Sequence, residues 1–215
     1  MKNILCKIVI VWSLLNIPHA IANSDQIDLE AKTFTSTLED QLRLIKVRFP
    51  DDPNALRAVV EEVILTNVDA KYFAYKVLGK HGVKMTEQQK LVFTELLKGS
   101  MVNNYISVLK HYNNESLILE AVSLSESGKT AKTKILITSV NNLTVKDKKI
   151  VLAWRYNKEK EEWKIYDLEA EGISLLQSKQ KEIASVINKH GIENMLALLS
   201  NKAQVTTKAT KSVEG

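Results

Sequence analysis

The fold is decided by residues 154–176, which read WRYNKEKEEWKIYDLEAEGISLL. Apolar side chains alternate with polar ones over residues 150–156, a charged turn follows, and residues 163–168 form a second apolar segment. Alternation with a period of two is typical of a β-strand that buries one face. This stretch therefore predicts an antiparallel ribbon of two strands.

A helix is predicted directly after the ribbon. Gly172 ends the second strand, and Ser174 with Gln177 forms a capping pair in which the serine oxygen accepts a backbone N–H of the first helical turn. We expect this helix to stop at Gly191 and a further helix to occupy residues 192–201. Two helices thus follow the ribbon in the chain.

The N-terminal half is predicted to be helical. Apolar residues between Ile27 and Phe49 recur at helical spacing, which places them on one buried face. Asp52 and Pro53 suit the N-cap and the first position of a second helix, and a third helix is expected to begin near Asp69. The chain thus opens with three amphipathic helices.

A long fourth helix is predicted to start at the capping box formed by Thr86 and Gln89 and to reach about Tyr112. The apolar pattern then changes to a period of two, which predicts strands at 117–124 and 134–140. Together with the ribbon they make an antiparallel sheet of about four strands. Helices before and after such a sheet define an α+β fold.

The first residues have the features of a secretory signal peptide. Lys2 and Lys7 precede an apolar run at 8–17, and Ala-Ile-Ala at 20–22 supplies the small residues that signal peptidase requires. The run is much shorter than the roughly 20 residues of a transmembrane helix. We therefore expect residues 1–22 to be removed on export.

The mature chain is predicted to be one domain over residues 23–201, followed by a disordered polar tail at 202–215 that is rich in Lys, Thr and Ser. The single cysteine, Cys6, lies within the signal peptide. An exported chain without cysteine cannot form disulfides, so an ordinary apolar core must hold it together.

The charge of the mature chain is mildly basic. The whole sequence has 30 basic and 25 acidic side chains, and removing Lys2 and Lys7 leaves 28 against 25, or +3. This is a mixed solvated surface rather than the strongly basic face of a nucleic-acid-binding protein. We expect no nucleic-acid partner.

The residues offer no enzyme signature. His81, His111 and His190 each stand alone, without a second histidine at metal-ligand spacing. Asp167 is the one carboxylate in an otherwise apolar strand, and a contact with water or a neighbouring loop is favoured over an acid–base role because no partner acid is evident. We expect no metal, no catalytic residue and no cofactor.

The large apolar residues leave a choice between a filled core and a ligand cavity. Patterning alone favours the core, since it records which side chains are buried and not whether the interior is hollow. The choice therefore depends on what the chain resembles.

Several segments together resemble the MlaC / toluene-tolerance family of periplasmic phospholipid-binding proteins. They are WR…W-x-x-YD-x-x-AEGIS at 154–174, KQ…HGIENML at 179–196 and LGKHGVK…LKHY at 78–112. The resemblance implies an NTF2-like curved antiparallel sheet whose helices enclose an apolar lipid cavity. It also implies a monomer located in the periplasm.

The resemblance further implies a carrier and not an enzyme. Its cargo would be a diacyl phospholipid, and its partners an inner-membrane ABC transporter complex with an MCE-domain subunit and an outer-membrane lipoprotein–porin complex. Carrying lipid between them would maintain outer-membrane lipid asymmetry. Head-group preference, the number of acyl chains held, the direction of transport and the docking surfaces stay open.

The residues expected to line the lipid cavity are large and apolar: Leu78, Phe93, Leu97, Met101, Tyr105, Leu109, Ile150, Leu152, Trp154, Tyr166, Leu168, Ile173 and Leu176. Exposed cations are candidates for partner docking: Arg155, Lys164 and Lys179. Two alternatives remain, an NTF2-like hydrolase or isomerase acting on an apolar substrate and an envelope adaptor protein with a solid core.

Overall fold

The computed structural model describes residues 19–49, 52–139 and 147–211, and within these ranges it places side chains from residue 24 to residue 201. The elements follow in this order: α1 (His19–Arg48), α2 (Pro53–Val59), the π-helical η1 (Val60–Ile64), α3 (Leu65–Asn67), α4 (Ala70–Leu78), the 3-10 helix η2 (Gly79–Lys84), α5 (Glu87–Leu109), β1 (Ser116–Leu124), β2 (Thr130–Thr138), β3 (Lys148–Asn157), β4 (Glu162–Ala170), β5 (Ile173–Ser174) and α6 (Leu175–Lys211). The predicted signal peptide falls mostly outside the described residues.

The strands form one open antiparallel sheet in the order β1-β2-β3-β4-β5. The predicted α+β class and the antiparallel ribbon are confirmed. The sheet has five strands rather than about four, because residues 173–174 pair with the end of β4 and add a short β5. The β3–β4 ladder has a bulge beyond Ala153, which shifts the register of the two strands.

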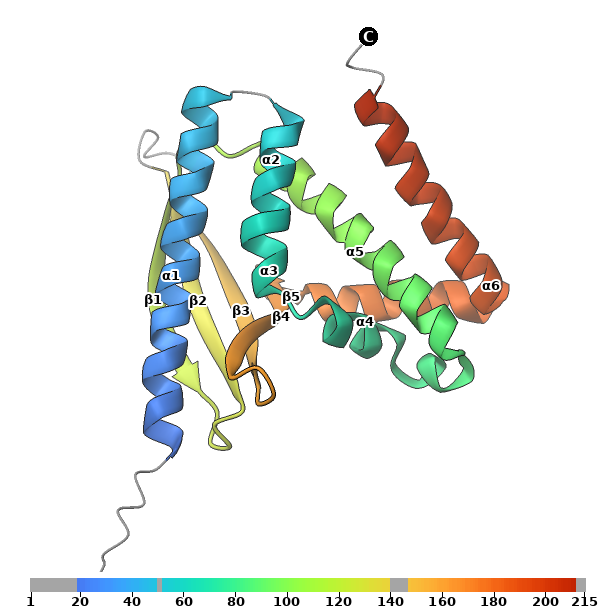
Figure 1. The fold of residues 1–215 in the computed structure, drawn as a ribbon, viewed down its shortest axis with the longest axis horizontal. Helices are drawn as coiled ribbons and strands as arrows, with labels where there is room; N and C mark the ends of the chain where they lie inside the picture. Colours follow the sequence, from blue (N-terminus) through green and yellow to red (C-terminus); the bar gives the residue numbers. More distant parts are fainter. Residues whose placement is uncertain (1–18, 50–51, 140–146, 212–215) are drawn as a thin grey trace, which may run out of the picture.

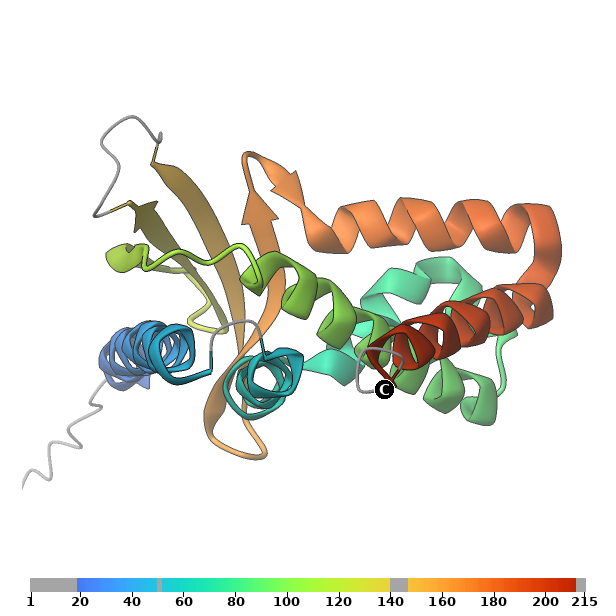
Figure 2. The same ribbon diagram turned by 90° about the horizontal axis from the view of Figure 1, so that it is seen from above.

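The helices divide into two groups (Figures 1 and 2). In Figure 2, α1 and α2 are seen end-on along the same side of the sheet. The helices α4, α5 and α6 form a separate lobe to one side of the sheet, which we call the helical lobe. α5 joins the two groups, since its N-terminal end lies in this lobe and its C-terminal end leads to β1.

The predicted helix starts are confirmed by their caps. The Asp52 carboxylate accepts the Asn54 N–H at 2.8 Å, with Pro53 as the first residue of α2. At α5 the Thr86 hydroxyl accepts the Gln89 N–H and the Gln89 side chain accepts the Thr86 N–H, which is the full capping box. The second of these caps fixes the start of α5, whose C-terminal part lines the cavity.

The C-terminal helix differs from the prediction at its end. Gly191 has φ 79° and ψ 172°, so α6 breaks there into two helical parts, as predicted from that glycine. The second part continues to Lys211, whereas the sequence predicted a disordered tail from residue 202. No glycine or proline interrupts residues 192–211, so nothing in the backbone chemistry stops the helix earlier.

Two of the apolar cores matter for the site. The helical lobe is closed by a cluster from α4, α5 and α6: Phe73, Ala74, Val77, Leu78, Met85, Phe93, Leu97, Met101, Ile183, Ile187, Met195 and Leu199. A second cluster joins α1 to the sheet: Ile27, Ala31, Phe34, Ala131, Ile135, Leu152, Trp154, Trp163 and Ile165. Members of both clusters line the cavity, Phe73 and Met101 from the first and Ile135 and Leu152 from the second.

Candidate ligand-binding cavity

A cavity of about 910 Å³ lies between the sheet and the helices that face it. Its helical wall comes from α1, the end of η1, Phe73 of α4 and the C-terminal part of α5, and its sheet wall from β1 to β4. The apolar lining includes Phe34, Leu38, Leu42, Ile64, Val68, Phe73, Met101, Val108, Leu109, Leu117, Ile135, Ile137, Ile150, Leu152, Ile165, Leu168 and Leu175. The volume is near the top of the range of about 300–1,000 Å³ for small-molecule sites.

The sheet wall follows from strand register. Ile135 of β2 lies opposite Ile150 of β3, and Ile150 lies opposite Ala170 of β4. Residues directly opposite in an antiparallel pair share one face, so these three form a row across the sheet. Leu152 and Leu168 form the neighbouring row. Both rows contribute to the cavity wall.

One helix contributes to both the cavity and the solid lobe. Phe93 and Leu97, in the N-terminal half of α5, are buried in the lobe cluster against α4 and α6. Met101, Tyr105 and Leu109 follow at intervals of four residues, and these line the cavity. Residues four apart share one face of a helix. The same apolar stripe therefore meets packed side chains at one end and open space at the other.

Six charged or polar lining residues lie around one end of the cavity, which we call the mouth. They are His111, Glu115, Ser139, Lys148, Lys149 and Glu171, and further polar lining residues are Thr35, Ser107 and Asp167. Strand pairing brings them together, since Leu117, Ile137 and Lys148 lie opposite one another where β1 begins, β2 ends and β3 begins. The side chains of Lys148 and Glu171 are exposed. The cavity thus has apolar walls and a charged opening.

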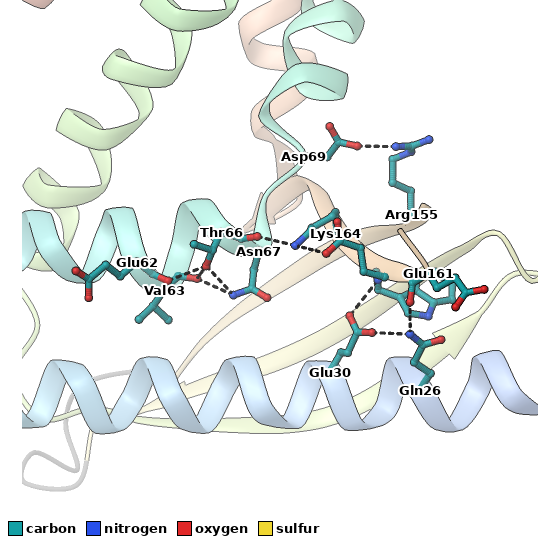
Figure 3. Close-up of polar contacts among 12 residues, drawn as sticks. Gln26, Glu30, Glu62, Val63, Thr66, Asn67, Asp69, Arg155, Glu161 and Lys164 are labelled. Atoms are coloured by element: carbon teal, nitrogen blue, oxygen red, sulfur yellow. Dashed lines mark hydrogen bonds and ion pairs between the residues drawn. The ribbon is translucent and has the colours of Figure 1, made fainter. Parts of the chain in front are cut away.

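The opposite end of the sheet is held against the helices by polar contacts (Figure 3). Gln26 donates to the backbone carbonyl of Glu161 at 2.8 Å, and Glu30 accepts the Trp163 N–H at 3.1 Å. Lys164 donates to the carbonyl of Thr66 at 2.7 Å. The β3–β4 hairpin is therefore tied to both α1 and α3, which closes the structure at the end away from the mouth.

Tyr105 brings a polar group into the apolar wall. Burial raises the pKa of Tyr105 to about 12, and the negative charge of Asp167 acts in the same direction. The phenol is therefore uncharged near neutral pH. Its hydroxyl has no hydrogen-bond partner among the described residues, so it is available to a ligand in the cavity.

Asp167 has a structural role in the described contacts. One carboxylate oxygen accepts the backbone N–H groups of Leu168 and Leu176 at 2.8 and 2.9 Å, and the other accepts the Ser174 hydroxyl at 2.6 Å. The Ser174 oxygen in turn accepts the Gln177 N–H at 3.0 Å, as predicted for the capping pair. Asp167 therefore holds the first turn of α6, in agreement with the interpretation that it bonds a neighbouring loop.

The structure places seven of the thirteen expected lining residues on the cavity wall. They are Met101, Tyr105, Leu109, Ile150, Leu152, Tyr166 and Leu168. They come from α5, β3 and β4, which the sequence had grouped only by their apolar character.

The other six lie outside the cavity wall. Leu78, Phe93 and Leu97 belong to the solid core of the lobe, and Leu176 packs beside it. Trp154 is fully buried between α1 and the sheet, where its indole N–H donates to the Thr133 hydroxyl at 3.0 Å. Ile173 is 66% exposed at the start of β5. Burial and proximity to the cavity are thus separate properties.

The three cations suggested for docking have partners within the chain. Arg155 forms an ion pair with Asp69, the N-cap of α4, and stacks over the Tyr72 ring at 4.3 Å. Lys164 pairs with Glu162 at 2.9 Å, and Lys179 pairs with Glu182 at 2.6 Å. These contacts give all three side chains a structural role.

Sequence reasoning did not select the part of the lining that comes from α1, β1 and β2: Phe34, Leu38, Leu42, Leu117, Ile135 and Ile137. The helical spacing of α1 and the apolar character of the first two strands did mark these residues as buried. What was missing was the register that aligns Leu117 with Ile137, which only the fold supplies.

Among the described residues, no helix is both long and apolar enough to cross a bilayer. No group of three or more His, Cys, Asp or Glu side chains is arranged to hold a metal ion in the same ranges.

Comparisons with known proteins agree on one family. The family model described as "MlaC protein" matches residues 32–201. The intermembrane phospholipid transport system binding protein MlaC of Haemophilus influenzae is 26% identical over 156 residues, which cover 73% of this chain and 72% of that protein. The toluene tolerance protein ttg2D of Pseudomonas putida is 25% identical over 167 residues, covering 76% and 74%.

A solved structure shares the fold. It is a phospholipid-binding protein from Ralstonia solanacearum in complex with a phospholipid, and it superimposes with a TM-score of 0.63. The match covers 88% of this chain and 97% of that one, at 14% sequence identity. The similarity therefore concerns the arrangement of the elements.

Proposed function

The chain belongs to the MlaC family, and we propose that it is a phospholipid carrier whose cavity shelters acyl chains while the head group stays at the charged mouth. The observation that carries this proposal is the cavity of about 910 Å³ with mainly apolar walls and a mouth that bears charged side chains, among them Lys148, Lys149 and Glu171. That distribution matches an amphiphile with an apolar body and a charged end. The similarity to proteins named for phospholipid binding or transport supports the same ligand class.

The energetics favour a carrier that exchanges with membranes. Removing about 30 methylenes from water is worth roughly 20 kcal/mol, at about 0.8 kcal/mol for each methylene. A bilayer shelters the same chains equally well, so transfer between bilayer and cavity is close to balanced. The direction of transfer must then come from partner proteins.

The cellular role that fits the family is transport across the periplasm. In this proposal residues 1–22 direct export, and the mature protein carries lipid between an outer-membrane lipoprotein–porin complex and an inner-membrane ABC transporter with an MCE-domain subunit. The name of the Haemophilus influenzae relative, which refers to intermembrane phospholipid transport, supports this proposal. Such traffic would maintain the lipid asymmetry of the outer membrane.

The alternatives fit the site less well. A hydrolase or isomerase would use Asp167 as its base, but both oxygens of that carboxylate already accept hydrogen bonds, from Leu168, Ser174 and Leu176. An adaptor protein would have no use for a large apolar cavity with a charged mouth. Binding without catalysis is therefore the proposed activity.

A substitution that fills the cavity tests this proposal, provided that the variant still folds. Ile150→Trp places a large side chain into the cavity from the middle of the sheet. The matched control is Ile118→Trp, since Ile118 is 47% exposed. Ile118 and its partner Leu136 each lie one residue from the lining pair Leu117 and Ile137, and successive residues of a strand point to opposite faces of the sheet. Lipid content is measured by organic extraction of protein purified without detergent, and folding by circular dichroism.

We expect the control to retain bound phospholipid and Ile150→Trp to lose most of it, with both proteins folded. Equal phospholipid content in the two folded variants would contradict the assignment of the cavity as the lipid site. If Ile150→Trp does not fold, Ala170→Leu fills the same row of the wall with a smaller side chain and gives the same comparison.

A further inference from the structure

A short segment of the helical lobe, which runs from beside β4 to an outer corner of the lobe, carries most of the net charge of the chain. Residues 70–92, which comprise α4, η2 and the first turns of α5, contain five lysines and one glutamate, or +4. The whole chain has a net charge of +5. We call residues 70–92 the lysine tip; Figure 1 shows η2, between α4 and α5, at an outer corner of the lobe.

The lysines of the tip differ from the three cations considered above. Lys71, Lys76, Lys80 and Lys84 are exposed, and none of the four has an ion-pair partner among the described residues. The fifth, Lys90, pairs with Glu87 at 2.7 Å. The tip thus presents four cations whose charges are not neutralised within the described chain.

Apolar and aromatic side chains lie among these cations. Val83 is 87% exposed in η2, between Lys80 and Lys84 in the sequence. The ammonium groups of Lys71 and Lys90 each lie 5.9 Å from the centre of the half-exposed Tyr75 ring. The surface therefore combines lysines with an exposed apolar side chain and an amphipathic aromatic ring.

We propose that the lysine tip docks on the surface of a bilayer that contains anionic phospholipids. Clustered lysines are attracted to acidic head groups, and their aliphatic stems can rest on the apolar boundary while the ammonium groups stay in water. Tyrosine favours the same interface because one end of its ring system is polar. Val83 would enter the head-group region between Lys80 and Lys84.

The position of the tip leaves the cavity accessible. The tip surrounds the N-terminal end of α5, whereas the mouth residues follow its C-terminal end. A helix of 23 residues is about 34 Å long, at about 1.5 Å a residue. Docking through the tip would hold the protein at a membrane while its mouth stays open to another partner, and it does not require the cavity to hold lipid.

The test measures co-sedimentation of the mature protein with vesicles. One set contains equal parts of phosphatidylglycerol and phosphatidylcholine, and the other contains phosphatidylcholine alone. The variant Lys80→Glu/Lys84→Glu alters the tip, and Lys132→Glu/Lys134→Glu is the matched control. Lys132 and Lys134 are exposed on β2 and give the same change in net charge.

We expect binding to the acidic vesicles at low salt, little binding to the neutral ones, and loss of binding at high ionic strength. Each lysine near an acidic surface contributes about fivefold, so the tip variant should bind roughly 30-fold more weakly, and the control should change much less. Val83→Ser should weaken binding by a smaller factor that salt does not alter.

Three results would overturn the proposal. The first is no binding of the wild-type protein to acidic vesicles at low salt. The second is an equal loss in the tip and control variants, which would show that only net charge matters. The third is binding to immobilised polyglutamate without binding to vesicles, which would assign the tip to an acidic protein surface. The phospholipid content of each variant, measured by extraction, reports separately on the cavity.

Discussion

The two ends of α5 lie in regions built from the same kinds of residue but with opposite interiors. In the helical lobe, Phe93 and Leu97 meet α6 through Ile183 and Met195, and the space is filled. Toward the sheet, Met101 and Tyr105 continue the same apolar stripe but line a cavity of about 910 Å³. The difference arises from what lies opposite the helix, since the C-terminal part of α5 faces the sheet wall across this cavity, whereas its N-terminal part packs against α4 and α6.

This comparison separates stability from function. A filled core contributes to the free energy of unfolding through close packing of its side chains. Side chains that border a cavity make fewer packing contacts but leave room for a ligand. Shortening a side chain in the lobe should therefore lower the free energy of unfolding, whereas enlarging a side chain on the cavity wall should reduce ligand binding.

The largest expected effect is in the lobe. Phe93→Ala removes a fully buried ring from the packed cluster and should lower the free energy of unfolding by about 3–5 kcal/mol. The matched change in the wall is Leu168→Ala, which should cost only about 1 kcal/mol because that half-buried side chain borders open space. Urea denaturation of the lipid-free proteins measures both, and equal costs would contradict the contrast.

The second prediction concerns Tyr105 at alkaline pH. The pKa of Tyr105 is about 12 in the folded protein against 10.0 ordinarily, so the unfolded chain releases this proton first as pH rises. The wild-type protein should therefore lose stability relative to Tyr105→Phe as pH rises from 10 to 12. At about 1.4 kcal/mol for each pKa unit, the difference should be about 2 kcal/mol.

Denaturation of both proteins across this pH range measures the effect. The pKa values of Tyr112 and Tyr166 are also raised by burial, but these residues are present in both proteins and cancel in the comparison. A constant stability difference between pH 9 and 12 would mean that Tyr105 is not shielded from water by the wall.

The smallest effect is expected at the N-terminus of α5. Thr86→Ala removes the hydroxyl that accepts the Gln89 N–H and should cost about 1 kcal/mol. Since this cap lies in the lobe, the phospholipid content of the folded protein should not change. A loss of bound lipid from folded Thr86→Ala would show that the two regions are coupled through α5.

Much of the fold could be predicted because it rests on local chemistry. The caps at Asp52, Thr86 and Ser174, the break at Gly191 and the strand ribbon all depend on residues close in sequence. The extension of α6 past residue 201 could not, because polar composition was interpreted as disorder although those residues include no helix breaker.

The site was only partly predictable, because its residues come together through strand register and helix placement. Trp154 and Leu152 both read as inward-facing residues of one strand, yet only Leu152 reaches the cavity. Lys164 read as an exposed cation but bonds the carbonyl of Thr66, 98 positions earlier. Periodicity identifies buried positions; it does not show which of them border empty space.

Native mass spectrometry of the mature protein purified without detergent shows whether the cavity holds a phospholipid. We expect a folded species whose mass exceeds that of the polypeptide by the mass of a diacyl phospholipid, and we expect Ile150→Trp to lose that increment. A folded wild-type protein that appears only at the mass of the polypeptide, after expression in cells rich in phospholipid, would contradict this expectation.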